Sequence, residues 1–247
     1  MIEWSETHLM VRDMVRKFVD TEIVPNLEAL EHGDLPPYDI IRKLMRSLGV
    51  TDAARARYEA QKQKALSGAQ AGDAAKGDGG GGMDAGDATA FQMIPIMELS
   101  RYCPGMVTAL GVSMGLTAGA IMAKGTWAQK DRWALPILTL DKIGAWAITE
   151  PGSGSDAFGS MKSVARRDGD GYVLNGQKTF ITNGPWADTI VFICKLDRGE
   201  ADARDRQVVS FILDRGMEGL VQSKPLRKMG MHSSPTGELF LDNVRVG

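Results

Sequence analysis

The sequence predicts an α+β fold, with an all-α helical domain over residues 1–140 followed by a β-sandwich or barrel-like domain over residues 141–247. Two observations lead to this prediction. In the first part, apolar side chains recur at spacings of three and four, as they do on one face of a helix. From Ile143 onward the spacing shifts toward two, and turn residues separate the runs. We expect the boundary between the two domains near residues 137–143.

Two helical patterns open the chain. The first places its apolar residues on one stripe: Trp4, Val11, Met14, Val15, Phe18 and Val19. Pro25 is expected to end or bend this helix because proline cannot continue the helical hydrogen-bond ladder. The second pattern covers residues 38–48 and is followed by Gly49, a typical helix stop. Both helices are predicted to serve packing.

Residues 66–88 are predicted to form a glycine-rich, mobile surface loop. Glycine, alanine and aspartate dominate this segment, and residues 79–82 are consecutive glycines. Such a composition buries too little apolar area to offset the entropy lost on ordering. A phosphate-binding loop is the alternative, but no strand and helix clearly flank the segment as that loop requires. Long loops inside compact domains also serve as lids.

Residues 102–123 contain no charged side chain, and Gly111, Gly115 and Gly119 recur every four positions. This pattern suits a membrane-spanning helix that dimerises through its glycines. It equally suits a buried soluble helix that packs closely, and Pro104 and several hydroxyl side chains lower the apolarity. We therefore expect a central helix of the helical domain and no membrane partner. An exposed helix holding Trp127 and Trp133 is expected to follow.

The β domain is predicted from short runs separated by turn residues. The runs cover residues 143–148, 161–167, 172–174, 189–194, 208–213 and 239–244. Residues 168–171 read Asp-Gly-Asp-Gly, a strong hairpin turn between two of them. Regular alternation with short turns indicates a sandwich or barrel of roughly a hundred residues.

Composition excludes some functions. A formal net charge of −2 with no block of basic residues argues against nucleic-acid binding. Cys103 and Cys194 are the two cysteines. They fit no paired motif and suit a reducing compartment, although a single bridge between them stays open. The acidic N-terminus does not resemble a signal peptide, so a cytoplasmic location is the simplest expectation.

Two polar segments stand out in the β domain: residues 145–156, AWAITEPGSGSD, and residues 175–184, NGQKTFITNG. In the first, Gly152 and Gly154 allow close approach to the backbone, and Thr149 and Ser155 offer hydroxyl groups. Such a segment can hold a polar ring edge or a pyrophosphate without a net charge. Taken alone, each segment is more simply a turn of the β domain.

Neither segment fits a common phosphate-binding motif. Gly152, Gly154 and Gly159 have the wrong spacing for the dinucleotide fingerprint, and no Rossmann pattern surrounds them. Gln177 stands where a Walker loop needs lysine. The three histidines, His8, His32 and His232, are not at metal-binding spacing. The sequence therefore predicts no metal site.

Together, in this order and separation, the two segments closely resemble the flavin-facing motifs of the acyl-CoA dehydrogenase family. The resemblance extends from the N-terminal helix through Val246, apart from the glycine-rich segment, and also covers residues 228–236. There, relatives often have arginine where this chain has His232. The resemblance implies a helical domain, a β domain and a closing helical domain that would begin beyond Gly247.

The resemblance also implies site residues. The residues matched to FAD contacts are Trp146, Ile148, Thr149, Gly154, Ser155, Phe180, Ile181 and Thr182. Thr149 would bond the pyrimidine edge of the flavin, Gly154 and Ser155 the pyrophosphate, and Thr182 the N5 edge. Ser155 would also bind the pantetheine of the acyl-CoA substrate. Relatives commonly have tryptophan where this chain has Phe180.

The activity implied is that of an FAD-dependent oxidoreductase of fatty acid metabolism, converting an acyl-CoA to trans-2-enoyl-CoA. The catalytic glutamate would lie beyond Gly247, and Glu150 is expected to be structural. Electron-transfer flavoprotein or a similar acceptor, and a homo- or hetero-oligomer, are the implied partners. Two alternatives stay open: a non-catalytic subunit that binds FAD or acyl-CoA, and a flavin-dependent oxidase or monooxygenase on the same scaffold.

Overall fold

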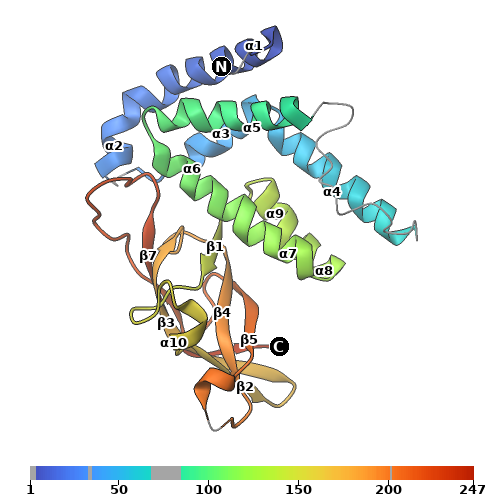
Figure 1. The fold of residues 1–247 in the computed structure, drawn as a ribbon, viewed down its shortest axis with the longest axis vertical. Helices are drawn as coiled ribbons and strands as arrows, with labels where there is room; N and C mark the ends of the chain where they lie inside the picture. The colour runs from blue at the N-terminus through green and yellow to red at the C-terminus, as the bar shows by residue number, and fades with distance from the viewer. Residues whose placement is uncertain (1–3, 33–34, 68–84, 201) are drawn as a thin grey trace.

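The computed structural model describes residues 4–32, 35–67, 85–200 and 202–247. Helices make up the first part of the chain and strands the second, which confirms the predicted α+β class. The strands lie together beneath the helices, and a long diagonal helix runs between the two parts (Figure 1). This diagonal helix contacts the first strand of the sheet.

The N-terminal helices are α1 (Glu6–Phe18), η1 (Val19–Ile23), η2 (Val24–Asn26), α2 (Leu27–His32), α3 (Tyr38–Ser47), α4 (Val50–Leu66) and α5 (Ala85–Ser100). Of these, α1 and α3 follow the two predicted helical patterns, whereas the sequence did not predict α4 and α5 as individual helices. Ser5 begins α1 with a capping box, because its hydroxyl accepts from the His8 amide and the His8 ring accepts from the Ser5 amide. Pro25 lies in the short 3₁₀ turn η2, so the chain bends there and continues into α2.

The glycine-rich segment lies largely outside the described residues. Of the predicted loop over residues 66–88, the structure describes only its two ends. Leu66 ends α4, and α5 already begins at Ala85. Residues 85–88 are therefore helical, which corrects the predicted loop boundary. Ahead of α4, Gly49 adopts a φ of 69°, the left-handed conformation that ends α3 at low cost.

The long apolar helix is made of α6 (Pro104–Leu110), η3 (Gly111–Ala118) and α7 (Gly119–Lys124). Among the described residues it is the one helix that could cross a membrane by length and composition, a test that core helices of soluble proteins also pass. A side chain added at Gly111 or Gly115 would meet no described atom within 4 Å. Within the described residues, neither of these two glycines of the stripe therefore makes a close contact with another element.

The last helices are α8 (Trp127–Gln129), η4 (Lys130–Ala134) and α9 (Leu135–Leu138). Trp127 and Trp133 are half-buried here, so the expectation of an exposed helix is only partly correct. The Trp133 indole donates to the carboxylate of Asp214 at 2.9 Å, which ties this helix to the sheet. An indole N–H buried in this way needs such a partner.

The described strands form a single curled, mixed sheet. They are β1 (Gly144–Ala147), β2 (Val164–Asp168), β3 (Gly171–Thr182), β4 (Thr189–Asp197), β5 (Val208–Asp214), β6 (Leu220–Gln222) and β7 (Thr236–Val246), and α10 (Ala157–Ser160) lies between β1 and β2. The order is β1-β4-β2-β3-β7-β6, with β5 on the other side of β4. β1 and β2 run parallel to β4, and the remaining pairs are antiparallel.

The sheet differs most from the sequence prediction in two places. β3 continues through Thr182, so most of the second polar segment is strand, whereas the sequence predicts a run over residues 172–174. The sequence does not predict β6, because three residues are too short for a periodic signal. The predicted hairpin turn is confirmed, with β2 and β3 paired from Asp168 and Gly171.

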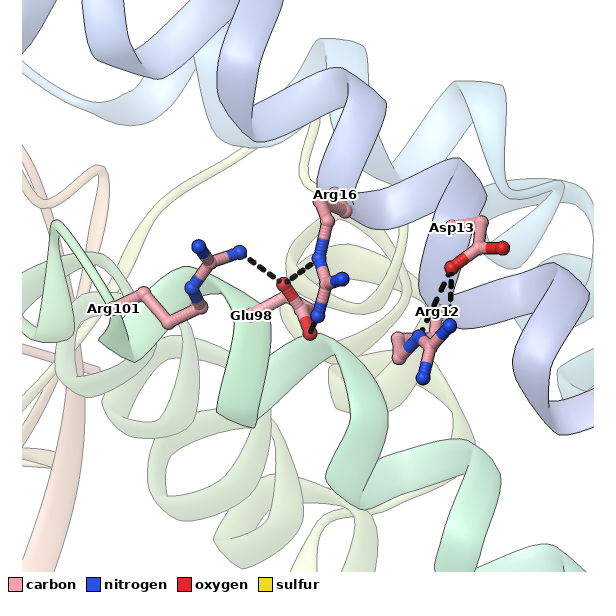
Figure 2. Close-up of polar contacts among 5 residues, drawn as sticks. All are labelled: Arg12, Asp13, Arg16, Glu98 and Arg101. Carbon is pink, nitrogen blue, oxygen red and sulfur yellow. Dashed lines mark hydrogen bonds and ion pairs between the residues drawn. The ribbon is translucent and has the colours of Figure 1, made fainter. Parts of the chain in front are cut away.

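The helical part is joined by an ion-pair cluster around the buried carboxylate of Glu98. The Glu98 carboxylate of α5 accepts two hydrogen bonds from the Arg16 guanidinium of α1, of 3.0 and 2.7 Å. It accepts one of 2.9 Å from the Arg101 guanidinium (Figure 2). These contacts, most of all the Arg16 hydrogen bonds, hold the pKa of the Glu98 carboxyl below its ordinary value. The cluster therefore contributes to holding α1 against α5 while Glu98 stays ionised.

Candidate functional site

The first polar segment leaves β1 as a tight turn. Glu150 and Ser153 exchange backbone hydrogen bonds of 2.9 and 3.1 Å, and the Ser153 hydroxyl donates to the Asp156 carbonyl at 2.8 Å. This closes the turn and leaves Gly152 and Gly154 exposed at its tip. A Cβ at either glycine would meet no described atom within 4 Å. The turn thus presents bare backbone to open space.

Alternation along β1 separates two faces. Ala145 and Ala147 are fully buried in the core of the sheet. Trp146 and Ile148 point the other way and are half-buried against a cluster that includes Ile121 of the diagonal helix. Two of the side chains expected at a flavin, Trp146 and Ile148, therefore share one face of the segment, turned toward the helices.

The second polar segment contains a β-bulge. The pairing of β3 with β7 shifts register between Lys178 and Ile181. Phe180 lies in this bulge with a φ of 55° and is 67% exposed. A positive φ is unfavourable for a bulky residue and is found where the surrounding structure enforces it, often at functional sites. The bulge turns an aromatic ring out of the sheet.

The two segments cross and are bonded to each other. The Thr179 amide donates to the Thr149 carbonyl at 2.9 Å. The Lys178 ammonium, with no exposed surface, donates to the Ile148 carbonyl at 3.0 Å and to the Glu150 carboxylate at 2.8 Å. Residues thirty positions apart in the sequence are thereby brought into one site. Sequence reasoning did not assign a role to Lys178, because its neighbours in the segment are mostly polar and nothing there marks one lysine as buried.

Burial and hydrogen bonding act together on this ion pair. Burial of the Glu150 carboxyl acts to raise its pKa, but hydrogen bonds from Lys178 and from the amides of Lys162 and Ser163 outweigh it and leave the pKa below its ordinary value. Burial lowers the pKa of Lys178, and Glu150 opposes this effect. Fixed donors inside the protein hold Glu150 ionised. Its carboxylate therefore serves the structure of the site.

Three hydroxyl groups expected to bind ligand have no partner within the described residues. They belong to Thr149 and Thr182, both half-buried, and to Ser155, which is exposed. Buried or half-buried hydroxyls usually find a hydrogen-bond partner. The free hydroxyls, the bare glycine turn and the outward Phe180 ring fit a bound planar group with a polar edge and a phosphate-bearing tail. Ile181 differs, because its side chain is only 2% exposed and lies in the sheet core.

Asn183, at the end of the second segment, joins the helical part to the sheet. It is fully buried with a φ of 65°. Its amide donates to the carbonyls of Ala109 and Gly144 at 2.9 Å each, and its oxygen accepts from the Tyr38 hydroxyl at 3.1 Å. Burial, with the nearby charge of Asp188, raises the pKa of Tyr38, so this hydroxyl keeps its proton. Sequence reasoning missed this role.

The loop before β7 is also fastened to the helices. The Ser233 hydroxyl donates to Glu31 of α2 at 2.7 Å. His232 contacts the Lys228 carbonyl through Nε2, as expected for a locally satisfied histidine. The Lys228 ammonium donates to the carbonyls of Met231 and Ser234 and to the Thr236 hydroxyl. The loop is therefore held from within by a lysine.

Comparison with known families agrees with this geometry. Residues 145–244 match the acyl-CoA dehydrogenase middle domain, and residues 5–56 and 57–141 match the acyl-CoA dehydrogenase N-terminal domain. The chain belongs to the acyl-CoA dehydrogenase family. This confirms the resemblance inferred from the two motifs. Members of the acyl-CoA dehydrogenase family depend on FAD.

Among curated members of the acyl-CoA dehydrogenase family, a short-chain specific acyl-CoA dehydrogenase of Megasphaera elsdenii is 31% identical over 233 residues, which are 94% of this chain and 55% of the relative. A 3-(aryl)acrylate reductase of Clostridium sporogenes is also 31% identical, over 98% of this chain and 57% of its own length. The chain thus spans about half the length of the curated relatives it matches.

Solved structures of acyl-CoA dehydrogenases share the fold. Butyryl-CoA dehydrogenase of Megasphaera elsdenii superposes with a TM-score of 0.76 at 29% identity, covering 100% of this chain and 58% of that one. An acyl-CoA dehydrogenase of Bacillus anthracis complexed with FAD gives 0.73 at 28% identity, covering 99% and 37%. A structure described for the electron transferring flavoprotein of Acidaminococcus fermentans gives 0.75 at 29%, covering 100% and 57%.

Proposed function

We propose that this chain forms the N-terminal and middle parts of an FAD-dependent acyl-CoA dehydrogenase that converts an acyl-CoA thioester to the trans-2-enoyl-CoA. The observation that carries this proposal is the crossing of the two polar segments, which bonds the two motifs to each other and leaves the hydroxyls of Thr149 and Thr182 without a partner among the described residues. Family membership supports it. The proposed division between the two domains lies near residue 140, between α9 and β1.

The site residues take roles that their positions allow. Trp146, Ile148 and Phe180 would border the flavin ring, with the hydroxyls of Thr149 and Thr182 available to its polar edges. Gly154 and Ser155, at the exposed turn, would meet the pyrophosphate, and Ser155 the pantetheine of the substrate. Because the Ile181 side chain is in the sheet core, we propose that this residue contributes its backbone alone.

When bound, FAD supplies the acceptor for the hydride that leaves the β-carbon of the substrate. A general base must reach the α-proton at hydrogen-bond distance. Glu150 is unsuited to that task, because its carboxylate already accepts from Lys178, Lys162 and Ser163. We propose that the base is a glutamate outside residues 1–247.

Partners and location are proposed on the same basis. The relatives' names support an acyl-CoA substrate, and the description of the Acidaminococcus structure supports an electron-transfer flavoprotein as acceptor. A homo- or hetero-oligomer in the cytoplasm is the arrangement we propose. Size-exclusion chromatography with light scattering on the native protein tests the oligomer, and a monomer would contradict it.

A reductase is the second candidate. The Clostridium sporogenes relative, named for reduction of an arylacrylate, is as similar to this chain as the Megasphaera dehydrogenase. A reductase would oxidise its reduced flavin with an unsaturated acid and would leave a saturated acyl-CoA unchanged. Mixing the reduced protein with each substrate class under argon separates the two directions of hydride transfer.

The main experiment is anaerobic titration of the native protein, as isolated from its source, with saturated acyl-CoAs of increasing chain length. Bleaching of the flavin band with formation of the enoyl-CoA supports the dehydrogenase. Flavin that binds acyl-CoA without bleaching indicates a binding subunit, and rapid oxygen consumption by the reduced protein indicates an oxidase or monooxygenase.

Ser155→Ala refines the substrate assignment. Loss of one neutral hydrogen bond should weaken acyl-CoA binding by about 1 kcal/mol, roughly fivefold. Ser210→Ala, at an exposed position on β5, is the matched control and should bind normally. Equal affinities for the two variants would remove Ser155 from the substrate site.

A further inference from the structure

The buried pair of Lys178 and Glu150 lies directly under the crossing of the two polar segments. The Lys178 side chain is 0% exposed and the Glu150 side chain 5% exposed. The ammonium bonds the carboxylate and the Ile148 carbonyl, and it lies 5.2 Å from the centre of the Phe192 ring. Thr149 and Phe180, two residues expected at the flavin, flank this pair in the sequence.

Glu150 connects three stretches of chain. One carboxylate oxygen accepts from the Lys162 amide at 2.7 Å, and the other from the Ser163 amide at 2.9 Å and from Lys178 at 2.8 Å. Its own backbone closes the glycine turn with Ser153. The pair therefore fixes the turn, the start of β2 and the bulge of β3 relative to one another.

A buried ion pair is a poor source of stability. Removing two charges from water costs several kcal/mol per ion, and apolar residues of similar volume often do as well or better. Phe192 and Cys194 of the sheet core are neighbours of this pair. The desolvation cost of this ion pair favours a role in holding the neighbouring segments in a fixed geometry.

We propose that Lys178 and Glu150 are positioning residues of the flavin site, which hold residues 148–150 against residues 178–182 so that Thr149 and Phe180 face the ring in a fixed arrangement. This inference rests on the proposed FAD binding. Removing the pair lets the two segments separate. Affinity for FAD and the environment of the ring then change even where the fold persists.

The test compares stability with flavin binding in the native, full-length protein. Lys178→Met/Glu150→Met removes both charges together, so no unpaired ion is left buried. The Lys162 and Ser163 amides and the Ile148 carbonyl lose their partners, so the unfolding temperature should fall while a single cooperative transition persists. We expect the FAD dissociation constant to rise at least about tenfold and the visible circular dichroism of the bound flavin to change. The single variant Glu150→Gln, which keeps the side-chain size, should show a smaller change in the same direction.

Glu98→Gln is the matched control, because Glu98 is a similarly buried carboxylate paired with arginine in the helical part (Figure 2). It should lower stability and leave FAD affinity within about twofold. Unchanged FAD affinity and dichroism in the Lys178→Met/Glu150→Met protein would overturn the positioning role alone. A wild-type protein that fails to bind FAD would overturn the proposed function and the positioning role with it.

Discussion

Replacing Asn183 with alanine should weaken the joint between the helices and the sheet. The substitution removes three buried hydrogen bonds, to the carbonyls of Ala109 and Gly144 and to the Tyr38 hydroxyl. At about 1 kcal/mol each, their loss costs about 3 kcal/mol. Alanine at the left-handed φ of residue 183 adds about 1 kcal/mol. The expected total is about 4 kcal/mol.

Thermal unfolding followed by far-ultraviolet circular dichroism measures this cost. For a chain of this size about 4 kcal/mol corresponds to a fall in melting temperature of roughly 8–16 °C. Asn183→Gly tolerates the positive φ, so it should recover about 1 kcal/mol of the loss and isolate the hydrogen bonds. Tyr38→Phe removes one of the three bonds and should cost about 1 kcal/mol.

The double variant Tyr38→Phe/Asn183→Ala should cost less than the sum of the two single variants, because both remove the same bond. A melting temperature within about 3 °C of wild type for Asn183→Ala would refute the reasoning. It would mean that water or a rearranged backbone satisfies the groups that Asn183 now pairs.

Three further predictions concern other parts of the molecule. Glu98→Gln should lower the free energy of unfolding by about 2 kcal/mol at neutral pH. Because the Glu98 pKa is lowered in the folded state, the difference in stability between wild type and variant should shrink as pH falls below 4.5. Urea titrations at several pH values measure this difference. Gly105→Ala should destabilise by about 1–3 kcal/mol, since the new Cβ would lie 2.5 Å from the Ser233 hydroxyl; Gly111→Ala, where no described atom is near, is its control in the same melting assay. Gly154→Ala should leave the melting temperature of the FAD-free protein unchanged and weaken FAD binding, measured by flavin fluorescence; unchanged affinity would show that the turn does not approach FAD closely.

The sequence predicted most of the fold because periodicity reports burial directly. The stripe beginning at Trp4 and the run over residues 38–48 each became helices, since one face of each is apolar. The Asp-Gly-Asp-Gly turn fixed the pairing of β2 with β3, because few residues adopt the turn geometry. The order and spacing of the two polar segments indicated the acyl-CoA dehydrogenase family, which the domain matches confirm.

Other features depended on contacts between distant residues. The spacing of Gly111 and Gly115 suggested close packing, yet a Cβ added at either would meet no described atom within 4 Å. In the same helix, a Cβ added at Gly105 would clash with Ser233. The β3 bulge at Phe180 arises from its pairing with β7, some sixty residues later. Nothing local in the sequence marks Lys178 as the partner of Glu150.

By itself, then, the sequence determined the α+β class, most of the strands and the family, because these depend on local patterns of apolar and turn residues. Tertiary structure decided which polar groups are buried together. Lys178 meets Glu150, and Asn183 meets Tyr38, only after strands and helices far apart in the chain have packed. In the extended chain, water solvates every charge and amide. Only folding removes that water, so only the folded structure decides which polar groups must pair with each other.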